Sequence, residues 1–439
     1  MSGPRDKGLA VPASRLGRLT RLGSMTAGVA GNMALGSMAQ LGRGQRPEWR
    51  NLLLTPANVT LIADQLAKMR GAAMKIGQLV SMDTGDVLPP ELSQIMARLR
   101  DDAHFMPPAQ LKKVLASQWH EGWLRDFARF DVHPIAAASI GQVHRAQLRD
   151  GRELAIKVQY PGVARSIDSD VANVGALIRM SGMLPKGFAI DPYLAEATRQ
   201  LHEETDYLRE AACLNRFRTL LDGAEGFILP QVHADWSTQN ILAMSFVEGR
   251  PIEEAASEDQ ALRNRIMERL VDLTLKELFA FRLMQSDPNF ANYRYDPQTA
   301  DIVLLDFGAT RDLSENISRD YKTFLKLGLR GAYDQLEAVA TRIGFLDDTI
   351  SSAHRSQCLH LMQLAFEALR VPMFDFSNTA LTKEMQRGGE ALARDGFIPP
   401  VVPMDVLYLQ RKFGGMFLLG ARLGAQLPLA DMMERYLVE

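Results

Sequence analysis

The sequence predicts an α+β protein with two lobes, in which a small lobe rich in β-strands precedes a larger and mainly α-helical lobe. The first observation is a pair of strand-like runs beyond about Asp131, GQVHRAQL and ELAIKVQ, separated by a strong hairpin signal at Asp150-Gly151. The second is the helical period of the apolar residues over most of the chain beyond Ile252. We therefore expect a small antiparallel sheet first and the helices after it.

Further elements complete this prediction. A long helix is predicted from about Pro192 to Leu221, and two strand-like runs follow it, FILPQVH and QNILAMSFV. The run DIVLLDFGAT predicts an apolar strand that ends in a turn, and the period from Thr55 to Arg100 predicts a helical N-terminal extension. The expected domains are a Gly-rich N-terminal segment over 1–50, the helical extension over 51–130, the β-rich lobe over 131–250 and the helical lobe over 251–439.

The composition argues against several classes of protein. Among the 439 residues, 50 Lys and Arg balance 52 Asp and Glu, so no global basic field favours nucleic-acid binding. The two cysteines, Cys213 and Cys358, form no CxxC pair, which argues against a disulfide framework or a thiolate zinc site. The eight His residues show no HxxxH or HxH spacing. A metal site is therefore expected to use carboxylates and a hard ion such as Mg²⁺.

A charge-free run from Leu22 to Leu41 follows a stretch rich in arginine. Interspersed glycines and polar residues such as Ser24 and Asn32 lower its hydropathy below that of a typical spanning helix. Its small residues recur near helical spacing, which permits close helix–helix approach. Three interpretations remain open: a packed or flexible segment, a peripheral membrane or self-association element that would allow a homodimer, and a membrane span.

Lys157 lies in LAIKVQ, a predicted strand directly after the hairpin. Phosphoryl transfer from ATP needs a cation on the α- and β-phosphates, and a strand lysine in this context can supply it. In LHEETDYLREA the helical period places Glu203, Asp206 and Glu210 on one face, so one of these acids could pair with Lys157. Each feature alone has an ordinary interpretation, a solvated edge lysine or a solvated acidic helix face.

Two later segments carry acids and an amide at kinase spacing. MQSDPNFAN contains Asp287 and, five residues later, Asn292, which is the spacing of a catalytic Asp and a magnesium-binding Asn. VLLDFGAT supplies Asp306 in an Asp-Phe-Gly motif after an apolar strand. Asp-Pro-Asn alone would indicate an ordinary turn. The conjunction predicts a bilobed protein-kinase-like fold that binds ATP and Mg²⁺, with Asp287 catalytic and with Asn292 and Asp306 on the metal.

At these residues the chain resembles the UbiB family, also called ABC1 or ADCK, of atypical protein-kinase-like ATPases associated with ubiquinone biosynthesis. MKIGQL matches the family's Lys-x-Gly-Gln motif at Lys75, Gly77 and Gln78. The run AAAS stands where ordinary kinases have a Gly-rich loop. The ATP-binding loop that the resemblance implies comprises Ala136, Ala137, Ala138 and Ser139. The resemblance also implies that Lys75 acts at the catalytic site.

The resemblance also decides between neighbouring acids. EETDYLREA matches the family's Glu-x-Asp element at Glu204 and Asp206, and Glu210 stands in the place of the acid that pairs with the nucleotide-binding lysine, here Lys157. Helix geometry alone favours Glu203, because Glu204 lies about 120° around a helix from Glu210. We follow the motif. The catalytic loop QSDPNFAN resembles that of the Coq8 subfamily, found in mitochondria and in related bacteria.

The resemblance implies an atypical kinase or ATPase that supports ubiquinone biosynthesis, acting on isoprenoid-lipid or quinone precursors or on a complex of biosynthetic proteins. The AAAS loop has few glycines, and no Ala-Pro-Glu segment or long activation loop is evident after Asp306. Both departures argue against protein phosphorylation. In the family the Lys-x-Gly-Gln segment folds over the active site, so Lys75 would occupy space that a protein substrate needs. A small-molecule or lipid kinase and a non-enzymatic nucleotide-gated scaffold remain alternatives.

The expected location depends on the source. In a bacterium it is the cytoplasm, with peripheral contact at the inner face of the membrane, and in a eukaryote it is the mitochondrial matrix. The short extension before the family match favours a bacterial protein. The C-terminal tail from Gly414 is too interrupted by charge to span a membrane.

Overall fold

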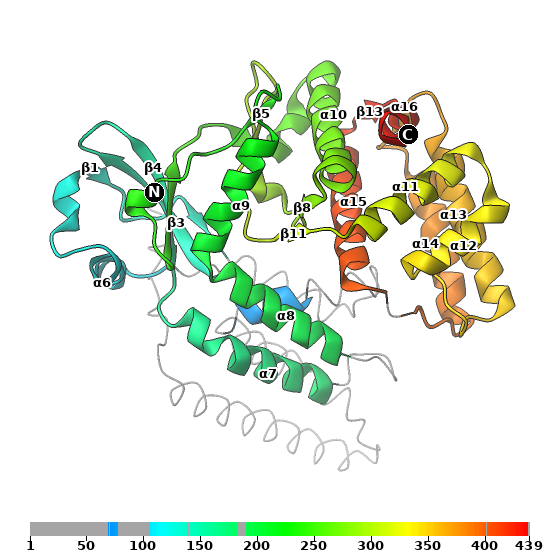
Figure 1. The fold of residues 1–439 in the computed structure, drawn as a ribbon, viewed down its shortest axis with the longest axis horizontal. Coiled ribbons are helices and arrows are strands. Elements are labelled where there is room, and N and C mark those ends of the chain that lie inside the picture. Colours follow the sequence, from blue (N-terminus) through cyan, green and yellow to red (C-terminus); the bar gives the residue numbers. More distant parts are fainter. Residues whose placement is uncertain are drawn as a thin grey trace, which may run out of the picture. The chain divides into compact units, whose positions relative to one another are not determined.

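The computed structural model describes Met69 and residues 71–77, 105–138, 140–181, 190–400 and 402–437. Its described residues form two compact units, the first drawn from Met1–Ala212 and Gln231–Phe246 and the second from Cys213–Pro230 and Val247–Glu439 (Figure 1). Helices and antiparallel sheets coexist, which confirms the predicted α+β class. The segment over 1–50, with its charge-free run, lies outside the described residues, as do Gln78 and Ser139.

The first unit contains a five-stranded antiparallel sheet in which β4 lies between β3 and β6. Strands β1, β3 and β4 of this sheet are labelled in Figure 1. Its strands are β1 (Phe127–Phe130), β2 (Ala136–Ala137), β3 (Gly141–Leu148), β4 (Glu153–Gln159) and β6 (Ile241–Ser245). The predicted hairpin is confirmed, because β3 and β4 pair around a turn in which Gly151 has a φ of 93°. Glycine adopts this left-handed conformation without steric cost.

Helix α6 and an aromatic cluster pack against this sheet. Besides the helical stretch over 71–77, the helices in the described part of this unit are α6 (Pro108–Gln118), α7 (Val163–Ser181), α8 (Asp191–Glu204) and the first part of α9 (Tyr207–Leu220). Leu111 and Leu115 of α6 are buried together with Leu154 and Ile156 of β4. The rings that contact one another beside them are those of Trp119, Trp123, Phe127, Phe130 and Trp236. The small sheet therefore has a substantial apolar core of its own.

The prediction of one long helix from Pro192 to Leu221 is wrong. The structure has two helices, α8 and α9, separated at Thr205 and Asp206. The carboxylate of Asp206 accepts a hydrogen bond of 2.9 Å from the backbone N–H of Arg209, which caps the start of α9. A short acidic side chain thus competes with the helix for backbone donors and restarts it.

The second unit is mainly helical. Its helices are the remainder of α9, α10 (Gln260–Lys276), α11 (Glu315–Arg330), α12 (Tyr333–Ile343), α13 (Ser352–Leu369), α14 (Thr379–Arg394), α15 (Met404–Leu423) and α16 (Leu429–Leu437). Helices α10 and α15 lie side by side, as do α11 and α12, and α13 and α14 (Figure 1). Among the described residues, no helix combines the length and the apolar character that crossing a bilayer requires.

Short strands connect these helices. They are β5 (Phe227–Ile228), β7 (Arg250–Pro251), β8 (Leu283–Gln285), β9 (Tyr293–Tyr295), β10 (Ile302–Leu304), β11 (Thr310–Asp312), β12 (Phe374–Asp375) and β13 (Gln426–Leu427). The predicted apolar strand in DIVLLDFGAT is confirmed as β10, which lies between β5 and β9. Strand β8 pairs with β11, so that Gln285 lies opposite Thr310.

The packing of α11 on α13 depends on a glycine. A Cβ atom added at Gly328 would overlap the ring of Phe366, which is itself buried. We expect Gly328→Ala to lower the free energy of unfolding by about 1–3 kcal/mol, because the core is already filled. Gly389→Ala in α14 is the control, because no atom lies within 4 Å of the new Cβ. It should raise the free energy of unfolding by up to about 1 kcal/mol, because alanine has the higher helix propensity. Equal effects in urea denaturation would contradict this packing.

His144 of β3 predicts a pH dependence of stability. Its side chain is fully buried, and burial lowers its pKa. The N–H of Met106 donates to Gln142 Oε1, so the side-chain amide nitrogen of Gln142 faces Nε2 of His144, at 2.8 Å. The other ring nitrogen of His144, Nδ1, lies 2.8 Å from the carbonyl oxygen of Asp131. A neutral ring with its proton on Nδ1 satisfies both contacts.

Because the unfolded chain binds this proton first, stability should fall as the pH drops below about 6.5, by at most about 1.4 kcal/mol per pH unit, until the lower folded-state pKa is reached. Urea denaturation at pH 7.5 and pH 5.5 measures the loss. In His144→Gln this part of the loss should disappear. An unchanged pH dependence in the variant would contradict the assignment.

Candidate functional site

Lys157 lies on the central strand β4, and its ammonium contacts Glu210 in the first turn of α9. Its Nζ donates to both carboxylate oxygens of Glu210 at 2.8 Å. The two side chains are only 9% and 2% exposed. The Nζ also lies 5.2 Å from the ring centre of Tyr207, close enough for a cation–π contribution. The first unit therefore presents a lysine whose position is fixed by a buried carboxylate.

A second lysine of the first unit, Lys75, pairs with Glu204 at the end of α8. Lys75 is 4% exposed and belongs to a helical stretch over residues 71–77, which also contains Gly77. This pair joins the Lys-x-Gly-Gln segment to the Glu-x-Asp element. Asp206, the other acid of that element, caps α9 as described above.

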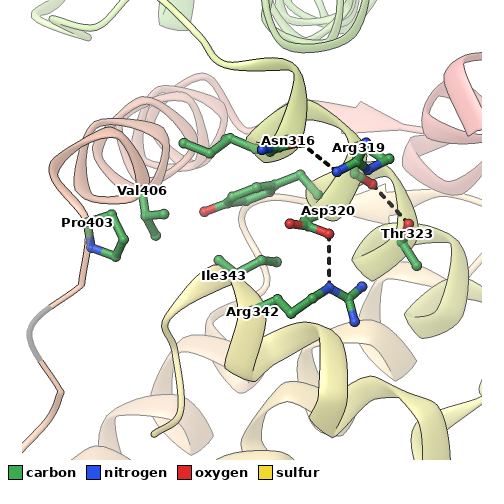
Figure 2. A pocket seen from close by; sticks show the side chains of 10 residues that line it. Asn316, Arg319, Asp320, Thr323, Arg342, Ile343, Pro403 and Val406 are labelled. Atoms are coloured by element: carbon green, nitrogen blue, oxygen red, sulfur yellow. Dashed lines mark hydrogen bonds and ion pairs between the residues drawn. The ribbon is translucent and has the colours of Figure 1, made fainter.

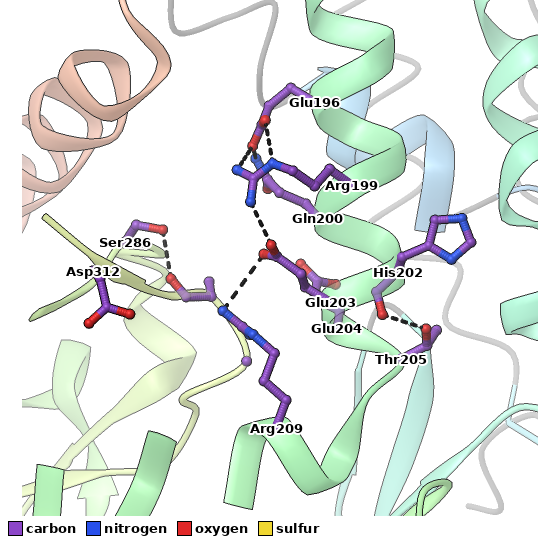
Figure 3. Close-up of polar contacts among 12 residues, drawn as sticks. Glu196, Arg199, Gln200, His202, Glu203, Glu204, Thr205, Arg209, Ser286 and Asp312 are labelled. Atoms are coloured by element: carbon purple, nitrogen blue, oxygen red, sulfur yellow. Dashed lines mark hydrogen bonds and ion pairs between the residues drawn. The ribbon is translucent and has the colours of Figure 1, made fainter. Parts of the chain in front are cut away.

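Glu203, which helix geometry alone favoured, takes part in a different network (Figure 3). Its carboxylate contacts Arg199 at 2.5 Å and Arg209 at 3.7 Å. Arg199 in turn donates to the buried carboxylate of Glu196 through two nitrogens. The neighbouring acids at the end of α8 therefore have different partners: Glu203 pairs with arginines and Glu204 pairs with Lys75.

The AAAS run begins as a short strand. Ala136 and Ala137 form β2 and lie opposite Val143 and Gln142 of β3, with both alanines exposed. The N–H of Ala138 donates to the carbonyl oxygen of Gly141 at 2.8 Å. The described part of the predicted ATP-binding loop, Ala136 to Ala138, is thus hydrogen-bonded to β3.

Asp287 and Asn292 lie in the second unit on the segment that joins β8 to β9. The side-chain amide of Asn292 donates to the backbone oxygen of Asp287 at 3.1 Å and to its Oδ2 at 3.4 Å. Asn289 accepts from the N–H of Ala291 and so begins the 3-10 turn Phe290–Asn292. Local hydrogen bonds therefore bring the predicted catalytic acid and the predicted metal-binding amide together.

Asp306 follows β10, and backbone contacts hold its segment beside that of Asp287. The N–H of Leu305 donates to the carbonyl oxygen of Asn292 at 3.0 Å, and the N–H of Ser286 donates to that of Ala309 at 3.1 Å. The carboxylate of Asp306 accepts from the N–H of Gly308 at 2.9 Å, which orients it. The second unit thus gathers two carboxylates and one carboxamide.

Sequence reasoning missed the basic residues around this group. Arg411 of α15 donates to Oδ1 of Asp287 at 2.5 Å, and the next residue, Lys412, pairs with Glu277 at 2.9 Å. Glu277 lies in the π-helical turn Glu277–Phe281 that follows α10. No spacing links residues this far apart in the chain, so only the fold reveals them.

A cavity of about 670 Å³ in the second unit lies among α11, α12 and α15 (Figure 2). Asp320 and Arg342 form an ion pair of 3.1 Å at its wall. Tyr321 also lines it, and its buried hydroxyl makes no hydrogen bond to any described residue; burial raises its pKa. None of the described residues that line this cavity is a predicted site residue.

Comparison with known proteins identifies the family to which this chain belongs. A family model for the ABC1 atypical kinase-like domain matches residues 98–340. The chain is 37% identical over 432 residues to the mitochondrial atypical kinase COQ8 of Saccharomyces cerevisiae, and the match covers 98% of this chain and 86% of that relative. It is 36% identical over 437 residues to the mitochondrial atypical kinase COQ8B of Danio rerio, which covers 98% and 69%.

A solved structure, the complex of Rv3197 from Mycobacterium tuberculosis with erythromycin, shares the fold with a TM-score of 0.61 and 24% identity. The match covers 86% of this chain and 95% of that one. The fold is therefore the bilobed, kinase-like α+β arrangement that the sequence predicts. The chain belongs to the ABC1 family of atypical kinases, and its Coq8 relatives share nearly its whole length.

The Lys157–Glu210 pair predicts a marked effect on stability. Glu210→Gln removes a buried counter-charge that contacts the ammonium through two hydrogen bonds, so the free energy of unfolding should fall by about 3–5 kcal/mol. Glu390→Gln, which alters a pair that is 78% and 53% exposed, is the matched control and should change it by less than about 1 kcal/mol. Chemical denaturation measures both variants. A loss for Glu210→Gln no larger than the control's would contradict the burial of the pair.

Proposed function

We propose that this chain binds ATP with Mg²⁺, turns it over mainly by hydrolysis, and supports ubiquinone biosynthesis in this way. The observation that carries the proposal is the gathering of Asp287, Asn292 and Asp306 by backbone hydrogen bonds in the second unit. Membership of the ABC1 family supports the kinase-like chemistry. The Coq8 relatives and the resemblance to the UbiB family support the role in ubiquinone biosynthesis.

In this proposal each charged residue has a separate task. Lys157, held by Glu210, neutralises charge on the α- and β-phosphates. Asp287 orients the attacking oxygen and accepts its proton, which for hydrolysis is a proton of water. Ala136, Ala137, Ala138 and Ser139 enclose the phosphates with fewer glycines than an ordinary kinase loop. Bound Mg²⁺, held by Asp306 and Asn292, would offset the negative charge that develops during transfer.

The donor set fits magnesium. Asp306 offers a carboxylate and Asn292 a carboxamide oxygen, both hard ligands of the kind that Mg²⁺ prefers. No group of three or more His, Cys, Asp or Glu residues suited to a metal occurs in the described part of the chain. A pair of ligands, Asp306 and Asn292, is compatible with Mg²⁺, which commonly takes one or two protein ligands and completes its shell with water and phosphate oxygens.

Two features support turnover by hydrolysis over phosphorylation of proteins. After Gly308 the chain enters β11, and α11 begins at Glu315, capped by the side chain of Ser314. This short connection leaves little chain for a peptide-binding platform. The buried Lys75–Glu204 pair anchors the Lys-x-Gly-Gln segment, which in the proposal restricts access to the nucleotide.

The remaining parts of the proposal concern partners and location. ATP hydrolysis would act on isoprenoid-lipid or quinone precursors, or on other proteins of ubiquinone biosynthesis, and ADP would be released. Peripheral membrane contact and a homodimer are compatible with this role. Both relatives named above are mitochondrial, which favours the mitochondrial matrix if the source is a eukaryote and leaves the bacterial inner membrane face as the alternative.

Asp306→Asn tests the metal role. Loss of the carboxylate charge should lower magnesium-dependent ATP hydrolysis by about 100-fold or more, because the metal loses a charged ligand. Asp312→Asn, which alters an acid that is 72% exposed and lies in the same segment, is the matched control and should hydrolyse ATP at the wild-type rate. Phosphate release by purified protein is the measurement. Undiminished turnover in Asp306→Asn would exclude the proposed site.

Radiolabelled ATP separates hydrolysis from the alternative of a small-molecule or lipid kinase. With purified protein and prenylated phenols, our proposal predicts that the label appears as inorganic phosphate. Transfer of most of the label to the phenol would contradict hydrolysis as the main outcome. Nucleotide binding without either product would favour the non-enzymatic scaffold.

A further inference from the structure

Helix α15 presents two consecutive basic residues to the segment that carries Asp287 and Asn292. Lys412 is 1% exposed, and its Nζ contacts Glu277 Oε2 at 2.9 Å, Gln285 O at 3.0 Å and Tyr293 Oη at 3.2 Å. The hydrogen bonds to Gln285 O and Tyr293 Oη use two of the three ammonium donors, and Glu277 supplies the counter-charge. The N–H of Gln285 also donates to Glu277 Oε1 at 3.2 Å.

These contacts fix both ends of the catalytic segment. Gln285 closes β8 just before Ser286 and Asp287, and Tyr293 opens β9 just after Asn292. Lys412 and Glu277 therefore hold the two ends, while Ser286 and Asn292 between them form backbone hydrogen bonds to Ala309 and Leu305. A residue that sets the direction of the Asp287 side chain must therefore contact the segment between Gln285 and Tyr293.

Arg411 acts there. Its Nη2 lies 2.5 Å from Asp287 Oδ1, and the two side chains are 13% and 20% exposed. A charge-assisted hydrogen bond between partly buried groups is short and directional. Asn292, the other side chain in contact with this carboxylate in the described structure, approaches Oδ2 only at 3.4 Å. The direction of the carboxylate therefore depends mainly on Arg411.

One turn further along α15, Gly415 lies against Pro288. A Cβ atom added at Gly415 would overlap the Cβ and Cγ atoms of Pro288, whereas one added at Gly414 has no atom within 4 Å. Proline has no N–H to donate, so the backbone cannot fix this turn at Pro288 by that bond. The close approach of α15 fixes it by packing.

We propose that α15 positions the catalytic carboxylate, with Arg411 orienting Asp287 and Gly415 seating Pro288. This inference rests on the proposed function, because it assigns to Arg411 a positioning role for the residue proposed as catalytic. A displacement of the reacting groups by about 1 Å can lower the rate about 100-fold. Arg411 acts through Asp287 and does not itself need to touch the nucleotide.

The first experiment separates turnover from binding. In Arg411→Ala, kcat for magnesium-dependent ATP hydrolysis should fall by about 10- to 100-fold, while the nucleotide Kd stays within about twofold. Arg411→Lys should retain an intermediate kcat, because lysine keeps the charge but lacks the planar fork. Arg422→Ala, on the same helix with a side chain 57% exposed, is the control and should match wild type.

The second experiment uses the glycine pair and does not require that Arg411→Ala folds. Both glycines lie inside α15, so alanine gains the same helix propensity at either position. Gly414→Ala should leave kcat unchanged. Gly415→Ala should lower it by about 10-fold or more with nucleotide Kd unchanged, because Pro288 must move.

The outcomes distinguish this inference from the proposed function. If Asp287→Asn hydrolyses ATP like wild type, the proposed function fails. If Asp287→Asn is inactive while Arg411→Ala turns over at the wild-type rate or faster, only the positioning role fails. Equal kcat values for Gly414→Ala and Gly415→Ala would also overturn it. A loss of nucleotide affinity in Arg411→Ala as large as the loss of kcat would show that Arg411 serves binding instead.

Discussion

Three lysines are buried among the described residues, and each is paired with a glutamate. Removing an ammonium from water costs several kcal/mol unless a counter-charge and further hydrogen bonds replace the hydration. Each pair joins segments that lie apart in the sequence. The pairs are Lys75 with Glu204, Lys157 with Glu210, and Lys412 with Glu277. The chain can bury these lysines only in an arrangement that brings all six side chains to their partners.

This constraint explains why each unit contains buried charged residues, Lys75 and Lys157 in the first and Lys412 in the second. Buried ion pairs add little net stability compared with apolar packing, but they strongly disfavour any arrangement that separates the partners. Lys157 is thereby fixed against α9, and the segment that carries Asp287 is fixed against α15. Phosphoryl chemistry relies on charges held in place before the reaction, so the same pairing serves folding and the proposed catalysis.

The sequence predicted features that depend on neighbouring residues. Asp150-Gly151 marks a turn because glycine accepts a positive φ, and the apolar run before Asp306 marks a buried strand. Prediction failed where a side chain competes with the backbone, as when Asp206 separates α8 from α9. It also failed for Arg411, because its partner Asp287 lies far away in the chain and no local pattern records the pairing. The roles of all the predicted site residues stay predictions, and Gln78 and Ser139 also lie outside the described residues.

An experimental structure of the protein with Mg²⁺ and a non-hydrolysable ATP analogue tests the central claim most directly. The account predicts that Lys157 Nζ lies within hydrogen-bonding distance of the α- or β-phosphate, still paired with Glu210. It also predicts that Asp306 and Asn292 bind the metal through oxygen at about 2.0–2.1 Å. A nucleotide bound elsewhere, such as in the cavity lined by Tyr321, or a metal held without Asp306, would contradict it.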